Sequence, residues 1–247
     1  SLDHEARGVD ALWSRAHLMR DQPPAEWPDL LLLLGDQVYA DDSSPRAKDR
    51  IEARRPEWRD LPPEIVADYE EYCWLYDEAW SLPAERWLLS TVPSAMIFDD
   101  HDMIDDWNIS DRWVDDVQRE PWWDEHRVGG MVSYLVYQHL GNISPETIER
   151  EGLLAAAIDV DDATELLRAW ARSVDTRTPG DDGYRFSHHR RLGQTSVVTV
   201  DCRSDRVLEP GRRMMVGPSE WQWVRDRCLE TDGHLIFATS LPVFIAD

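Results

Sequence analysis

The stretch LLLLLGDQVYADD, residues 30–42, decides the fold of this chain. Five consecutive leucines are far too few to span a membrane, and such a run is typical of a buried strand. The run stops at Gly35, which lets the backbone turn tightly, and Asp36 follows at once. A second apolar run, Ala95 to Phe98, also stops in acidic residues, at Asp99-Asp100-His101-Asp102. The sequence therefore predicts two strands whose carboxyl ends carry carboxylates.

Apolar periodicity and breaks at Pro or Gly predict the remaining elements. Helices are expected at about residues 3–20, 64–80, 83–89, 122–140, 145–157, 161–174 and 218–229. Strands are expected at 184–188, 195–200 and 234–239, with the first two forming a hairpin around Gly193. Residues 43–55 and 107–120 are predicted to be loops, the second one lying over the site. This alternation indicates an α/β chain forming one domain over residues 1–247, with a helical insert at about 107–182.

Charge narrows the range of partners. The chain has 26 basic and 49 acidic side chains, and hence a formal net charge of -23. Such a field repels nucleic acid and anionic membranes, so neither is an expected partner. It also repels phosphorylated substrates unless cations or local arginines reverse the sign at the site. The 13 tryptophans and 42% hydrophobic residues indicate a folded interior rather than disorder.

Cysteine spacing and the chain ends leave the compartment open. Cys73, Cys202 and Cys228 show neither zinc-ligand spacing nor a disulfide framework. No apolar stretch reaches transmembrane length, and the chain starts at Ser1 without an initiator methionine or a signal-peptide pattern. Cytoplasmic and exported locations both remain compatible with the sequence, and so does any oligomeric state.

The first strand end is a candidate metal site. Open α/β sheets place their chemistry at the carboxyl ends of strands, and clustered oxygen ligands usually exist because a cation neutralises them. A carboxylate at Asp36 is placed to bridge two cations, although a loop Asp that caps a turn is a common alternative. Tyr39 is a candidate phenolate ligand for trivalent iron, or else an aromatic covering the sheet edge. Asp41 and Asp42 are candidate supporting groups or solvated charges, with Asp42 favoured as solvated.

The second strand end offers a further ligand and a proton donor. Asp100 is a candidate metal ligand. His101 is a candidate ligand or a donor of a proton to a departing alkoxide, and a His among three carboxylates is an uncommon accident. Asn108 offers a neutral oxygen suited to calcium, with a turn residue as the equal alternative.

The expected strand at 195–200 ends in two arginines, Arg203 and Arg206. A guanidinium fits phosphate oxygens in a bidentate fork, so one of the two is expected to hold a phosphoryl group, with pairing to a nearby Asp as the alternative. Cys202 has no neighbouring His in sequence and is not expected to be a nucleophile. The run His188-His189-Arg190-Arg191 is interpreted as a solvated hairpin tip. The tryptophan pairs are interpreted as packing residues: Trp122, Trp123, Trp221 and Trp223.

Five motifs in the expected order resemble the PhoD-type alkaline phosphatases, a branch of the calcineurin-like metallophosphoesterases. They are GDQVYAD at residues 35–41, FDDHD at 98–102 with DDW at 105–107, DCRSDR at 201–206, GPSEWQW at 217–223 and SLP at 240–242. Each motif is weak alone, and together they cover about residues 29–244. The family also carries an early strand with a Cys or equivalent ligand and a later Gly-Asp-x-His motif, which this sequence lacks. The sequence therefore resembles an internal piece of a longer enzyme.

The resemblance implies a sandwich of two β-sheets flanked by helices and a metal-dependent hydrolysis of phosphate mono- or diesters. It implies iron with calcium as cofactors, with manganese, zinc or magnesium as alternatives, and a small phosphorylated substrate. By position, Asp36 resembles the bridging carboxylate, Tyr39 the iron phenolate and Asp100 a further ligand. His101 resembles the leaving-group His, and Arg203 or Arg206 the phosphoryl-binding Arg. The competing hypothesis is an acidic calcium-binding module without turnover.

Overall fold

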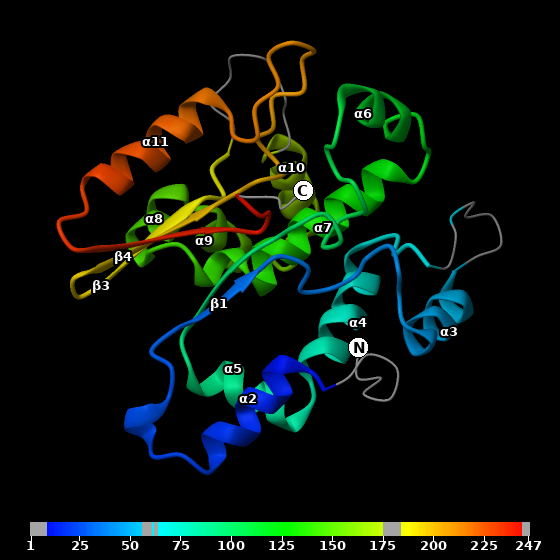
Figure 1. Cartoon of the computed structure of the whole chain (residues 1–247). Coiled ribbons are helices and arrows are strands. Elements are labelled where there is room, and N and C mark those ends of the chain that lie inside the picture. The colour runs from blue at the N-terminus through cyan, green and yellow to red at the C-terminus, as the bar shows by residue number, and fades with distance from the viewer. Residues whose placement is uncertain (1–8, 56–60, 62–63, 175–183, 244–247) are drawn as a thin grey trace, which may run out of the picture.

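The computed structural model describes residues 9–55, 61, 64–174 and 184–243. Two small sheets organise this part of the chain (Figure 1). In one sheet, β1 (Leu31–Leu34) pairs in parallel with β2 (Ser94–Ile97), with Leu31 opposite Ser94 and Leu34 opposite Ile97. The other sheet has the order β3-β4-β5. The mixed α/β class is therefore confirmed, while closure into a two-sheet sandwich stays a prediction.

The second sheet begins with the expected hairpin. β3 (His188–Leu192) runs antiparallel to β4 (Thr195–Val200), and β4 runs parallel to β5 (His234–Thr239). Helix α11 (Pro218–Leu229) packs along β4 and lies outside this sheet in Figure 1. The expected strand at 184–188 is wrong in its bounds, because the Ser187 N–H donates to Glu220 Oε1 at 3.1 Å instead of joining the ladder.

The strand β3 also corrects the prediction of a solvated tip at residues 188–191. These residues form the strand itself, and the tip lies at Gly193 with φ of 59°. Burial falls along the strand toward the tip: His188 is only 5% exposed, whereas Leu192, next to the turn, is 41% exposed.

Helices α2 (Ala11–Arg20) and α5 (Pro83–Thr91) pack together and cover the amino-terminal end of the first sheet, with the short η1 (Pro24–Glu26) between α2 and β1 (Figure 1). The Asp10 carboxylate accepts a hydrogen bond from the Trp13 N–H at 2.9 Å, which starts α2 at a proper N-cap. Residues 3–8 of the predicted helix lie outside the described residues.

The loop predicted at residues 43–55 is wrong, because α3 (Pro45–Arg54) occupies it. Its start follows ordinary capping rules, with Ser44 Oγ accepting from the Ala47 N–H at 3.1 Å and Pro45 in the first turn. Ala47 and Ile51, four residues apart, are both buried on one face. The exposed face of this helix is highly charged, so the composition of the segment did not indicate its short apolar stripe.

The helical core of the molecule is α4 (Tyr69–Trp80) against α7 (Trp123–Tyr137). Gly129 allows the close approach, since a Cβ there would lie 2.7 Å from the Asp68 carbonyl carbon. α10 (Thr164–Val174) packs on α7, and the cluster around Phe98 and Trp107 joins α7 to the end of β2.

The remaining helices fall between residues 107 and 174. The loop predicted at 107–120 is wrong in part, because α6 (Asp111–Val117) forms behind the cap Ser110. The helix predicted at 145–157 is two helices, α8 (Pro145–Glu151) and α9 (Leu153–Ile158), broken by Gly152 at φ of 71°. The short η2 (His139–Gly141) follows α7. Among the helices that the structure describes, none has both the length and the apolar character to cross a membrane.

Candidate metal centre

The turn after β1 brings the two strand ends into contact. Gly35 and Asp36 both have positive φ, at 93° and 51°. The Gly35 N–H donates to the Ile97 carbonyl at 2.9 Å, which continues the pairing of β1 with β2 by one residue. A Cβ at Gly35 would lie 2.7 Å from the Asp99 Cβ. Glycine is therefore required here by backbone conformation and by the close approach of Asp99.

Three carboxylates converge at this point: Asp36, Asp99 and Asp100 each offer an oxygen, and these atoms lie within 4.8 Å of one another. The two predicted ligands Asp36 and Asp100, which come from different strand ends, are thus brought together. Burial, and then the charges of Asp99 and Asp100, raise the pKa of Asp36. Such crowding of negative charge is stable only with positive charge close by.

Arg203 supplies part of that positive charge. Its Nε donates to Asp99 Oδ1, and its Nη2 lies 2.9 Å from Asp100 Oδ2. The residue is buried, at 4% exposure, and the Arg203 N–H donates to Asp201 Oδ1 at 2.7 Å. Arg203 therefore holds two carboxylates of the cluster in place, which is the ion-pair alternative left open by the sequence.

Arg206 has a different environment. Its Nε donates to the Cys202 carbonyl at 2.7 Å and its Nη1 to the Asn108 carbonyl at 3.3 Å. Burial, and then the charge of Arg203, lower the pKa of Arg206. Carbonyl oxygens orient a guanidinium without cancelling its charge, so Arg206 is the better candidate receptor for a substrate anion.

His101 is oriented by Asp41. The imidazole Nδ1 lies 2.9 and 3.0 Å from the two Asp41 carboxylate oxygens, and Nε2 lies 3.8 Å from Asp105 Oδ1. Burial alone would lower the pKa of His101, but the hydrogen bond to Asp41 and the charges of Asp41, Asp36 and Asp100 raise it overall. The sequence left the role of Asp41 open, and the structure makes it the partner of His101. Asp42 is exposed, as favoured.

Tyr39 lies at the same edge. Its neighbours Val38 and Ala40 are buried in the core, so the Tyr39 side chain points outward and is 45% exposed. Its ring packs against the His101 imidazole with 4.6 Å between centroids. Both interpretations of Tyr39, an edge aromatic and an iron ligand, agree with this position, and the ligand role stays a prediction.

Asp102 is a residue of the site that sequence reasoning missed. Its Oδ1 accepts from the Gln37 N–H and from Gln138 Nε2, each at 3.1 Å, and its Oδ2 from the Asp99 N–H at 3.0 Å. Burial raises the pKa of Asp102 to about 7. This carboxylate ties the two strand-end loops to α7, and the only sequence signal for it was its place among neighbouring acids.

Asn108 is a turn residue in the structure, which was one of its two predicted roles, the other being a calcium ligand. It is fully buried with φ of 61°, and its Nδ2 donates to the Arg203 carbonyl at 3.1 Å. A second acidic group, Asp100 with Asp105 and Asp106, lies beside the first one. Asp99 was also missed as a member of the cluster, since Asp100 alone was selected from that run.

The donor set fits hard cations. Among the described residues, the side chains that lie close enough together here to bind an ion are all carboxylates. Asp36, Asp99 and Asp100 would be the ligands. Carboxylate oxygens suit calcium, magnesium, manganese or trivalent iron better than copper or structural zinc.

Comparison with known proteins agrees with this geometry. A family model described as PhoD-like phosphatase matches residues 15–232, so the chain belongs to this family. A solved structure of PhoD superposes with a TM-score of 0.55 at 12% sequence identity, covering 92% of this chain and 38% of that chain. The two share a fold, and this chain spans well under half of the PhoD chain. Among curated proteins, none matches.

Proposed function

We propose that these residues form part of the active site of a metal-dependent phosphoester hydrolase that acts on small phosphate mono- or diesters. The observation that carries the proposal is the meeting of Asp36, Asp99 and Asp100 at two strand ends, with oxygens within 4.8 Å of one another. Membership of the PhoD-like phosphatase family supports the reaction class.

Asp36, Asp100 and Asp99 would hold the cations, for which we propose iron with calcium, and Tyr39 would complete part of the coordination. Bound metal ions would supply Lewis-acid activation of the phosphoryl group and of the attacking water. Arg203 positions Asp99 and Asp100 for this task through its two ion pairs.

Two side chains face the substrate in this proposal. Arg206 binds the phosphoryl oxygens. Within the described residues, its guanidinium donates hydrogen bonds to carbonyl groups alone. His101 holds Asp41 through Nδ1, which leaves Nε2 as the atom that delivers a proton to the departing oxygen. The proton on Nε2 is favoured by the carboxylates that raise the pKa of His101.

The test compares Asp36→Asn with Asp42→Asn, a matched change six residues away at an exposed side chain that pairs with Lys48 at 3.7 Å. D36N is expected to lose bound metal, measured by elemental analysis, and hydrolysis of p-nitrophenyl phosphate and its diester. D42N is expected to keep both. Metal binding without hydrolysis of either ester in the unaltered protein would favour the calcium-binding module instead, and full activity of D36N would refute the assignment.

A further inference from the structure

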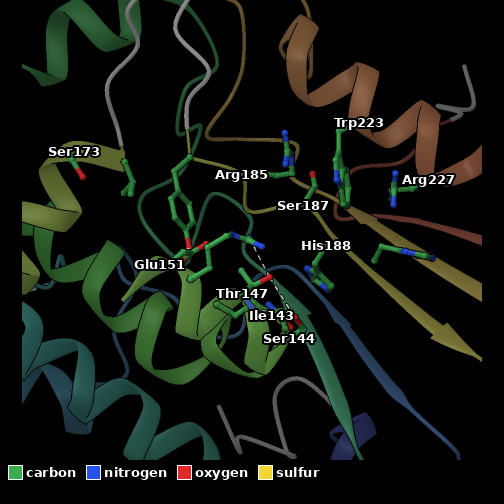
Figure 2. Close-up of a pocket in the computed structure, with 15 residues that line it drawn as sticks. Ile143, Ser144, Thr147, Glu151, Ser173, Arg185, Ser187, His188, Trp223 and Arg227 are labelled. Carbon is green, nitrogen blue, oxygen red and sulfur yellow. Dashed lines mark hydrogen bonds between the residues drawn. The ribbon is translucent and has the colours of Figure 1, made fainter. Parts of the chain in front are cut away.

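A cavity lies away from the carboxylate cluster. It has a volume of about 680 Å³ and is bounded by α8, the end of α10, β3 and α11. None of the described residues that line it belongs to the carboxylate cluster or to the arginine loop at 201–206. Figure 2 shows Arg185, His188 and Trp223 on one side of it and Ile143, Ser144 and Thr147 on the other.

The sign of the charge in this cavity is opposite to that of the chain. Among the described residues, its lining includes Arg150, Arg185 and Arg227, and Glu151 is the one carboxylate. Glu151 is occupied as an acceptor for the Tyr184 hydroxyl at 2.8 Å. In a chain of net charge -23, three guanidinium groups in one cavity form a local receptor for an anion.

Two of these arginines keep their charge unneutralised within the described residues. Arg150 Nη2 donates to the Thr147 hydroxyl at 3.2 Å, and Arg185 lies over the Trp223 ring at 5.1 Å from its centroid. Both contacts orient a guanidinium without removing its charge. Arg227 differs, since it pairs with Glu230, but its buried Nε finds no hydrogen-bond partner in the part of the chain that the structure describes.

His188 adds a second, independent sign of a ligand. It is 5% exposed, and its Nε2 has no hydrogen-bond partner among the residues that the structure describes. Its Nδ1 lies 3.4 Å from the Phe186 carbonyl, an acceptor, so the proton belongs on Nδ1 and Nε2 presents a lone pair. Burial lowers the pKa of His188 to about 4, which keeps the ring neutral. Buried acceptors are normally hydrogen-bonded, so a ligand hydroxyl is the donor that would satisfy His188 Nε2.

We propose that this cavity binds a small organic phosphate that bears hydroxyl groups, of the sugar-phosphate class. Arg150 and Arg185 bind its phosphate, His188 Nε2 accepts from a hydroxyl, and the Trp223 ring provides an apolar wall. The volume suits a ligand of this size, because small-molecule pockets usually measure about 300–1,000 Å³. The site is independent of the hydrolytic reaction proposed for the carboxylate cluster.

The test is calorimetric titration with the phosphonate analogue of glucose 6-phosphate, which resists hydrolysis, alongside inorganic phosphate and glucose. The phosphonate is expected to bind at least about tenfold more tightly than either of the others, which corresponds to about 1.4 kcal/mol. The double variant R150Q/R185Q is expected to lose this binding event. R225Q, an exposed change on α11 outside the cavity lining, is expected to retain it.

The variant R206Q distinguishes binding in the cavity from binding at the carboxylate cluster. Phosphonate binding in the cavity should persist in R206Q. Equal phosphonate affinity in R150Q/R185Q and the unaltered protein would overturn the proposal. Inorganic phosphate binding as tightly as the phosphonate would also overturn it, because the hydroxyl contact to His188 would then contribute nothing. Both arginines are substituted at partly or fully exposed positions, and a circular dichroism spectrum checks that the double variant folds.

Discussion

His101 Nδ1 lies 2.9 Å from Asp41 Oδ1, although the two residues are separated by 60 positions in the chain and follow different strands. This contact joins the loops that follow the two strands. A backbone hydrogen bond from the Ala40 N–H to the His101 carbonyl, at 2.8 Å, joins the same two loops. A carboxylate on Nδ1 fixes the ring and its tautomer, so Nε2 is the atom available for proton transfer.

Replacing His101 with Gln should therefore affect leaving groups unequally. General acid catalysis contributes about 10²–10⁴-fold where the leaving oxygen needs a proton. We expect H101Q to lower kcat strongly for alkyl phosphates and only slightly for p-nitrophenyl phosphate, with bound metal unchanged. Kinetics on both esters and elemental analysis measure this. Loss of metal in H101Q would make His101 a ligand instead, and D41N should reproduce a weaker form of the same selectivity.

Substitutions of the two arginines in the 201–206 loop should have different effects. Replacing Arg203 should lower stability, and replacing Arg206 should weaken phosphate binding. Arg203→Met leaves Asp99 and Asp100 buried without their partner, and breaking such a buried pair costs about 3–5 kcal/mol. R206M removes a charge that, within the described residues, is hydrogen-bonded to carbonyl groups alone. It should leave the free energy of unfolding within about 1 kcal/mol of the original. Urea unfolding measures both values.

The same pair differs in its kinetic consequences. R206M should raise the inhibition constant for inorganic phosphate and lower kcat/KM, whereas the conservative R206K should recover part of the loss as a point charge. A stable R203M protein with weakened phosphate binding, together with a destabilised R206M protein of normal affinity, would reverse the assignment.

These roles show which parts of the site the sequence could predict. The strand ends were readable because Leu31–Leu34 and Ser94–Ile97 are short apolar runs closed by acids, and parallel strands bring their carboxyl ends together. The choice between Arg203 and Arg206 was not readable, because it depends on which carboxylates lie within hydrogen-bond reach across about a hundred residues. The link of Asp102 to Gln138 depends on tertiary packing of α7 in the same way.

The errors in the fold have a related physical cause. Helix α3 was missed because its buried stripe is only Ala47 and Ile51, and charge dominates the rest. The start of β3 was misplaced because the Ser187 N–H donates to Glu220 and the Phe186 ring packs in the core, so neither residue joins a neighbouring strand. In both cases the outcome depends on which tertiary partner covers the segment, and local composition does not specify that partner.

Gly129 should be intolerant of a side chain. A Cβ there would lie 2.7 Å from the Asp68 carbonyl carbon and 2.8 Å from the Tyr69 nitrogen, both backbone atoms at the start of α4. We expect Gly129→Ala to cost about 1–3 kcal/mol, because the helices must move apart. Gly141→Ala is the control, since nothing lies within 4 Å of its added Cβ. Thermal unfolding compares the two, and equal midpoints would contradict the packing argument.

Glu220 should make the stability of the fold depend on pH. Burial, and then the charge of Asp201, raise the pKa of Glu220 to about 8, against an ordinary value of 4.5. Between these values the unfolded chain has released the proton while the folded chain retains it, so the free energy of unfolding falls as pH rises and the loss is complete above pH 8. Glu220→Gln stays neutral and avoids this loss.

The measurement is the unfolding midpoint of E220Q relative to the original protein, taken at a pH near 5 and again above 8. The difference should grow in favour of E220Q at the higher pH, because only the original protein must then bury a carboxylate next to Asp201. Glu149→Gln, an exposed change on α8, provides the control and should show the same difference at both values. A pH-independent difference for E220Q would mean that the Ser187 N–H bond to Glu220 Oε1 is enough to keep the carboxylate charged in the folded protein.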